Sequence, residues 1–221
     1  MSLFPIVGIG FLVGFRHAFE PDHLAAVTTL AMRRGGWSHS ARLGVAWGLG
    51  HTVSVAVVAT VLILLGIRVP ERFYSTAELG VAALLVILGV TSLWQEARRH
   101  RASLGSAHVA AHEARDPHLH PGELRSTSRA LGFGVAHGLA GSGAVIVLLV
   151  AAATSLRDQV TYLGAFGIGT IVGMTGVSLL TGIVTGAVAR SHRRAAVSLR
   201  VGAAVASTAV GLMLGWTTLT G

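Results

Sequence analysis

Two long uncharged apolar segments constrain this chain more than any other feature. Residues 53–67 and 201–221 contain no charged side chain. A bilayer offers no water to satisfy backbone polar groups, so only helices or closed barrels span it, and a spanning helix needs about 20 apolar residues. The segments do not alternate apolar with polar residues, which favours helices. We therefore expect an all-α polytopic membrane protein.

The composition supports this expectation and limits the chemistry. Charged side chains make up 12% of the 221 residues, whereas a soluble domain carries about a quarter. The chain has no cysteine, so any metal ligand must be nitrogen or oxygen. The 17 lysine and arginine positions are all arginine, and all of them except Arg16, inside the first predicted span, lie between apolar segments. We interpret them as topology signals next to a lipid bilayer, and we expect no nucleic-acid partner. The start of the chain lacks the basic stretch of a cleaved signal peptide.

We expect six transmembrane helices. Their approximate ranges are 3–31, 42–66, 77–95, 129–153, 160–189 and 196–218. The connections after the first, third and fifth spans carry 13 arginines, and the other connections carry three. The thirteen are Arg33, Arg34, Arg42, Arg98, Arg99, Arg101, Arg115, Arg125, Arg129, Arg190, Arg193, Arg194 and Arg200. Because arginine-rich loops stay in the cytoplasm, both termini are predicted to lie outside.

The two halves of the chain resemble each other at an offset of 119 to 122 residues. Residues 47–52 parallel 166–171, and His17 parallels His137. With three spans in each half, the halves are expected in opposite orientations, as a 3+3 inverted repeat of the kind found in transporters. The domains would then be a first repeat at 1–95, a cytoplasmic His/Arg-rich loop at 96–128 and a second repeat at 129–221. The alternative is that glycine-rich apolar helices resemble one another by chance.

A dense polar cluster interrupts the first span at residues 16–23. Charged groups in the middle of a membrane cost several kcal/mol and are functional candidates by default. On a continuous helix His17, Asp22 and His23 would point to about 0°, 140° and 240°, so they could not converge. Pro21 supplies a break, because it lacks a backbone N–H and clashes with the preceding turn. We therefore expect these side chains to face one cavity.

Two further histidines are expected at the same depth. With a rise of 1.5 Å per residue, Asp22, His23, His51 and His137 all lie roughly 10–14 Å from the inner membrane face. Imidazole and carboxylate ligands suit Ni²⁺, Co²⁺, Zn²⁺ or Cu²⁺ better than Mg²⁺ or Ca²⁺. The sequence therefore predicts a site for a divalent metal ion, formed by His17 together with these four residues.

Four other residues are predicted to support or gate this site: Arg16, Glu20, Pro21 and Ser142. Arg16 and Glu20 are four residues apart, and we favour a salt bridge that neutralises both. Alternatively, Glu20 accepts a hydrogen bond from a histidine and fixes its tautomer.

Residues 16–24 resemble the signature of the nickel/cobalt transporter (NiCoT) family, in which a histidine is followed, after four residues, by Asp-His. Residues 49–53 are similar to that family's second, Gly-His motif. The segment 137–144 lacks the acidic residues of the larger members, and in this the chain resembles the compact urease-accessory (UreH-type) relatives. The resemblance implies that His17, Asp22 and His23 take part in metal selection and transport, with His51 close by.

The function expected from these features is secondary transport of nickel or cobalt across the plasma (inner) membrane of a bacterium. The alternative is a metal-binding accessory protein that supplies a nickel enzyme such as urease or hydrogenase, with a metallochaperone or maturation protein as its partner. A membrane di-iron enzyme needs more histidines, clustered at one membrane face, so we expect no enzyme. The sequence contains no ATP-binding loop, so the energy would come from a gradient or a partner subunit.

The predicted cytoplasmic loop is rich in histidine. It holds His100, His108, His112, His118 and His120. We interpret the last four as possible accessory ligands that buffer the metal beside the pore. The alternative is a solvated basic loop in which histidine is simply a polar residue. Deleting residues 100–120 tests this, because retained transport would show that the loop is accessory.

Overall fold

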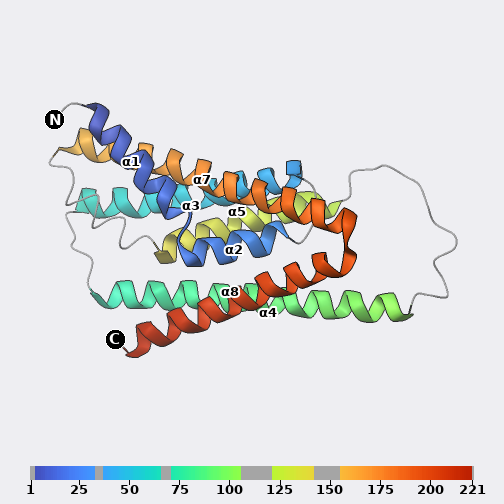
Figure 1. Ribbon diagram of the computed structural model, residues 1–221. Helices are drawn as coiled ribbons and strands as arrows, with labels where there is room; N and C mark the ends of the chain where they lie inside the picture. Colours follow the sequence, from blue (N-terminus) through green and yellow to red (C-terminus); the bar gives the residue numbers. More distant parts are fainter. Residues whose placement is uncertain (1–2, 33–36, 66–70, 106–120, 142–154, 221) are drawn as a thin grey trace.

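The computed structural model describes residues 3–32, 37–65, 71–105, 121–141 and 155–220 (Figure 1). Every regular element within these ranges is an α-helix, which confirms the all-α fold class. The helices are α1 (Leu3–His17), α2 (Pro21–Ala31), α3 (Trp37–Leu65), α4 (Glu71–Gly105), α5 (Pro121–Gly141), α7 (Leu156–Ser191) and α8 (Arg193–Thr220).

Several of these helices are long and apolar enough to cross a membrane. Four qualify on their own, within α3, α4, α7 and α8. A fifth span is formed if α1 and α2 are taken together, as a pair that bends by 62° at a short break. The predicted span 129–153 is described only as far as Gly141, in α5, and its remainder lies outside the described residues. The chain therefore has four or five candidate spans in its described part.

The short helix α2 lies inside the bundle. α3 packs against α5 and α7, α1 runs along α7, and α4 pairs with α8 (Figure 1). α2 contacts α3, α4, α7 and α8, and its Ala26 and Val27 belong to the main apolar core together with Trp47 of α3. The Thr29 hydroxyl also donates a hydrogen bond of 3.1 Å to the Ala203 carbonyl of α8. These contacts fix the position of the polar residues in the first turn of α2.

Glycines allow neighbouring helices to approach at backbone contact. A Cβ on Gly14 of α1 would overlap the backbone of Phe166 in α7. A Cβ on Gly134 of α5 would likewise overlap the Trp47 carbonyl in α3. Lipid tails are as apolar as leucine, so helices in a membrane associate through close packing of this kind. The glycines thus set how near α1 and α5 lie to their partner helices.

Replacing Gly134 with alanine is expected to destabilise the protein by about 1–3 kcal/mol, the usual effect of overpacking. Gly132→Ala is the matched control, since it lies in the same helix and an added Cβ would meet no atom of a neighbouring helix within 4 Å among the described residues. Thermal unfolding in detergent measures both variants. We expect a lower melting temperature for Gly134→Ala and an unchanged or slightly higher one for Gly132→Ala. Equal melting temperatures would contradict the close packing of α5 on α3.

Candidate metal centre

The centre is built on a chain break between α1 and α2. Pro21 is the first residue of α2, and Glu20 before it has extended backbone angles, with φ −62° and ψ 145°. A proline disfavours helical geometry in the preceding residue and is well tolerated at the first position of a helix. α1 therefore ends at His17, and α2 starts in a new direction. The break that the sequence predicts at Pro21 is present, as the start of a second helix.

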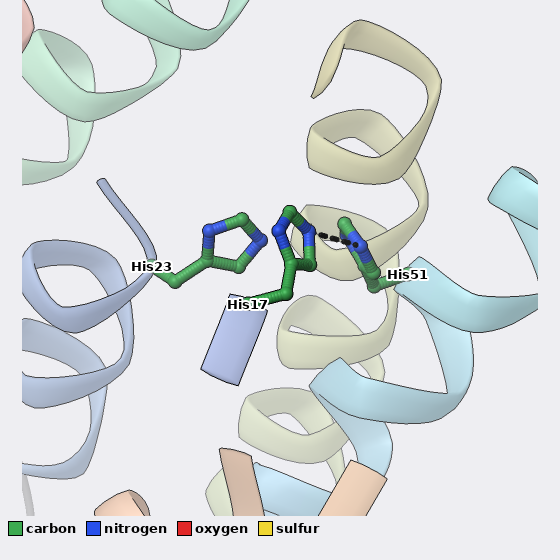
Figure 2. Close-up of side chains that lie close together, drawn as sticks. All are labelled: His17, His23 and His51. Atoms are coloured by element: carbon green, nitrogen blue, oxygen red, sulfur yellow. Dashed lines mark hydrogen bonds between the residues drawn. The ribbon is translucent and has the colours of Figure 1, made fainter. Parts of the chain in front are cut away.

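Three buried histidines meet at this break. His17 comes from the end of α1, His23 from the first turn of α2 and His51 from the middle of α3 (Figure 2). The Nε2 atoms of His17 and His51 lie 3.3 Å apart, and the ring centroids of His17 and His23 are 4.3 Å apart. Two nitrogen ligands at tetrahedral positions on one ion, each at ~2.0–2.1 Å, are themselves ~3.3 Å apart. The spacing of the first pair therefore suits coordination of one metal ion.

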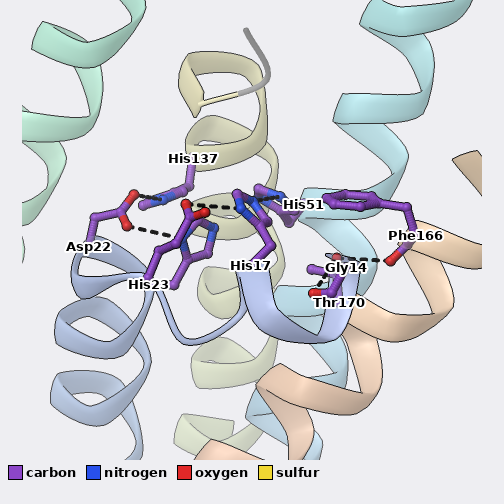
Figure 3. A network of polar contacts seen from close by, with 9 residues as sticks. Gly14, His17, Asp22, His23, His51, His137, Phe166 and Thr170 are labelled. Carbon is purple, nitrogen blue, oxygen red and sulfur yellow. Dashed lines mark hydrogen bonds and ion pairs between the residues drawn. The ribbon is translucent and has the colours of Figure 1, made fainter. Parts of the chain in front are cut away.

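A second group of candidate ligands lies on the other side of His23 (Figure 3). The Asp22 carboxylate accepts hydrogen bonds from His23 Nδ1 at 3.1 Å and from His137 Nε2 at 3.0 Å. His137 is a buried residue of α5, which thereby joins the site. The side chain of Asp22 is 22% exposed, whereas those of His23 and His137 are each 1% exposed. The carboxylate is thus the most accessible member of this group.

Two ring nitrogens in the centre are buried without a partner. His23 Nε2 and His51 Nδ1 have no hydrogen-bond partner in the described part of the chain. Leaving a buried polar atom unpaired costs about 1–3 kcal/mol, so such atoms are candidates for ligand binding. A metal ion at the His17–His23–His51 group would satisfy the free lone pair of His23 Nε2.

Glu20 positions His17, and this differs from the favoured sequence interpretation. The Glu20 carboxylate lies 2.9 Å from His17 Nδ1, and the structure shows no ion pair between Glu20 and Arg16, whose side chain is exposed. The helix ends at His17, so the two residues do not share the helical turn that a salt bridge at this spacing requires. The Nδ1–H of His17 donates to the carboxylate, which leaves its Nε2 lone pair directed at His51. The alternative interpretation of Glu20 is therefore the one that matches the structure.

Aromatic and hydroxyl side chains close the site, and sequence reasoning did not identify them. The Trp47 ring lies 5.6 Å from that of His137, and the Phe166 ring lies 5.4 Å from that of His17. The Thr170 hydroxyl donates a hydrogen bond of 3.2 Å to the Gly14 carbonyl and ties the end of α1 to α7 (Figure 3). The internal repeat could have identified them. Phe166 occupies the position in the second half that corresponds to Trp47, and Thr170 occupies the position that corresponds to His51.

The structure brings together all five predicted ligands, which are His17, Asp22, His23, His51 and His137. Among the predicted supporting residues, Glu20 and Pro21 lie at the site and Arg16 adjoins it. Ser142 and the loop histidines His108, His112, His118 and His120 lie outside the described residues. His100 is an exposed residue of α4 and belongs to neither ligand group.

Comparison with known sequences identifies a family that matches most of the chain. The sequence profile of the high-affinity nickel-transport proteins matches residues 3–213 of the chain. The chain belongs to this family. The family is one of metal transporters or accessory proteins and not of catalytic enzymes, and its match confirms the resemblance seen in the signature motif.

Two curated relatives extend the comparison. The urease accessory protein UreH of Bacillus sp. (strain TB-90) is 30% identical over 183 residues, which cover 83% of this chain and 78% of that protein. The hydrogenase nickel incorporation protein HupN of Bradyrhizobium diazoefficiens is 35% identical over 109 residues, which cover 42% of this chain and 28% of that protein. No solved structure matches the chain.

The hydrogen bond from His17 to Glu20 leads to a testable expectation. Glu20→Ala should weaken binding of Ni²⁺ or Co²⁺ about 10–100-fold, the usual effect of removing a group that orients a metal-binding histidine. Glu20→Gln keeps an acceptor and should recover part of the affinity. Glu78→Ala is the control, since Glu78 belongs to neither candidate ligand group and accepts a hydrogen bond from Thr218 near the end of α8. Titration with Co²⁺, followed by its visible absorption, measures the affinity; equal affinities for wild type and Glu20→Ala would contradict the role.

Proposed function

We propose that the protein is a secondary transporter that carries a divalent transition metal, nickel or cobalt, across the plasma membrane of a bacterium. His17, Asp22, His23, His51 and His137 would bind the ion during transport. The observation that carries the proposal is the convergence of four histidines and one aspartate at a chain break inside a bundle of membrane-suited helices. Membership of the high-affinity nickel-transport family supports the same conclusion.

The ligand chemistry favours a late transition metal. Neutral imidazoles suit Ni²⁺, Co²⁺, Cu²⁺ and Zn²⁺, whereas Mg²⁺ and Ca²⁺ prefer sites built from oxygen. A single carboxylate, Asp22, offsets half of the charge of a divalent ion, which lowers the cost of holding it among apolar helices. A site with several neutral ligands and one carboxylate can therefore bind the ion without trapping it as strongly as several carboxylates would.

We further propose a six-span, 3+3 inverted repeat with both termini outside, and the division at 1–95, 96–128 and 129–221. Helix contacts support the symmetry. Gly50 of α3 meets the Leu131 backbone of α5, and Gly169 of α7 meets the Phe11 backbone of α1. Gly50 corresponds to Gly169 at an offset of 119 residues, and Phe11 corresponds to Leu131 at an offset of 120. Each contact therefore maps onto the other when the two halves are exchanged, as a two-fold relation between them requires. Chance similarity of glycine-rich helices does not explain matched contact partners.

The printed names of the relatives favour a second candidate function. UreH is named as a urease accessory protein and HupN as a hydrogenase nickel incorporation protein. The chain would then hold nickel at the membrane and pass it to a metallochaperone or maturation protein, without transport of its own. Uptake into liposomes that contain only the purified chain separates the two, because an accessory protein would not fill the vesicles.

Transport is expected to depend on the ligands at the break. Asp22→Ala and His17→Ala should lower the initial rate of radioactive nickel uptake by about tenfold or more. Removing a group that only hydrogen-bonds a metal ligand already weakens metal affinity by about 10–100-fold. His39→Asn is a matched control, because His39 is a buried histidine of α3 outside both ligand groups. Its uptake should remain near that of wild type. Equal uptake by all variants would refute the site.

The orientation can be tested with single cysteines, because the chain contains none. Ser38 and Ser191 are exposed residues on the predicted cytoplasmic side, and Ser75 is exposed on the predicted outer side. In intact cells, a membrane-impermeant maleimide should label Ser75→Cys and should leave Ser38→Cys and Ser191→Cys unmodified until the cells are opened. The reverse pattern would overturn the proposed topology.

A further inference from the structure

We propose that the transported ion occupies two successive positions on opposite edges of the His23 ring, one at a time. The more exposed position, which we call the outer position, is formed by Asp22, His23 and His137. The inner position is formed by His17, His23 and His51. This inference rests on the proposed function, because it describes how the same site would pass its ion along.

The ligands fall into two groups that share His23. Within each group the ligand atoms all lie within 4.8 Å of one another. An ion with bonds of about 2.1 Å can hold ligands no more than about 4.2 Å apart, so each group is near the spread that one ion allows. All five ligands do not form one such group. A single ion would therefore coordinate one group or the other.

The His23 ring faces both groups. Its Nδ1 lies 3.1 Å from the Asp22 carboxylate. Its opposite edge points toward His17 (Figure 2), and the Nε2 on that edge is buried without a partner in the described chain. A neutral imidazole offers one nitrogen lone pair at a time, since its other nitrogen carries the proton. His23 can thus bind the ion at one edge or at the other, but not at both.

The two positions differ in access and in charge. The outer position contains Asp22, the most exposed of the five ligands. The inner position contains only imidazoles, of which His51 is fully buried. An anionic ligand attracts the dication as it leaves water, and a neutral set holds it less strongly. His17, in the inner position, donates a hydrogen bond to the Glu20 carboxylate, which is 53% exposed.

Binding and transport measured separately on the same variants test this inference. His51→Asn removes a ligand of the inner position only, and His137→Asn removes one of the outer position only. Each purified full-length variant, in lipid nanodiscs, should still bind a nickel ion, as measured by elemental analysis. X-ray absorption should report a carboxylate with imidazoles in His51→Asn and imidazoles alone in His137→Asn. Nickel uptake by either variant should fall about tenfold or more.

His23→Asn removes the shared ring and should lose both binding and uptake. His39→Asn, in the same helix as His51, should retain both, and gel filtration with circular dichroism verifies the fold of every variant. Should His51→Asn unfold, His51→Gln takes its place. Equal loss of binding in all three ligand variants would indicate one composite site and overturn the inference. Normal uptake by either single-position variant would overturn it too. A wild-type chain that neither binds nor carries nickel would instead refute the proposed function.

Discussion

The break before Pro21 is the constraint on which the rest of the site depends. Proline removes one backbone donor and disfavours helical angles at Glu20, so α1 stops at His17 and α2 starts four residues later, at Pro21. A continuous helix would spread its polar side chains around the axis. Two helix ends that meet at an angle of 62° point them at a common space. Irregular backbone at membrane depth is tolerated only where protein or a water-filled cavity surrounds it. The surrounding helices must therefore close tightly over the break.

Glycine contacts provide that closure and also bring the remaining ligands together. Gly138 follows His137 directly, and a Cβ at this position would meet the His51 carbonyl at 2.6 Å. The absence of a side chain lets α5 approach α3 at the level of the metal centre. As a result, the rings of His51 and His137 lie 6.0 Å apart although they come from different halves of the chain. The candidate metal ligands and the small residues beside them thus form one structural unit: the glycines set the helix spacing, and the spacing sets the geometry of the candidate ligands.

The sequence predicts the membership of the site better than its internal geometry. The rise along each helix places the four residues Asp22, His23, His51 and His137 at one level, and the structure brings them together. Rise gives depth but not direction around the helix axis, so it could not show that Asp22 pairs with His137. The favoured Arg16–Glu20 salt bridge failed for a related reason. Spacing of four residues implies contact only within a continuous helix, and the break that brings the ligands together also ends that helix at His17.

The proposed repeat is symmetric in its packing but not in its ligands. His137 occupies the position that parallels His17, and both reach the centre. Thr170 occupies the position that parallels His51, yet its hydroxyl bonds the Gly14 and Phe166 carbonyls within the helix packing. One half therefore supplies most of the ligands, and the other supplies one ligand and the support for α1. A symmetric ligand set would hold an ion equally from both sides, whereas this unequal set would give a bound ion different surroundings on each side. That difference lets a single shared ring such as His23 connect two unlike positions.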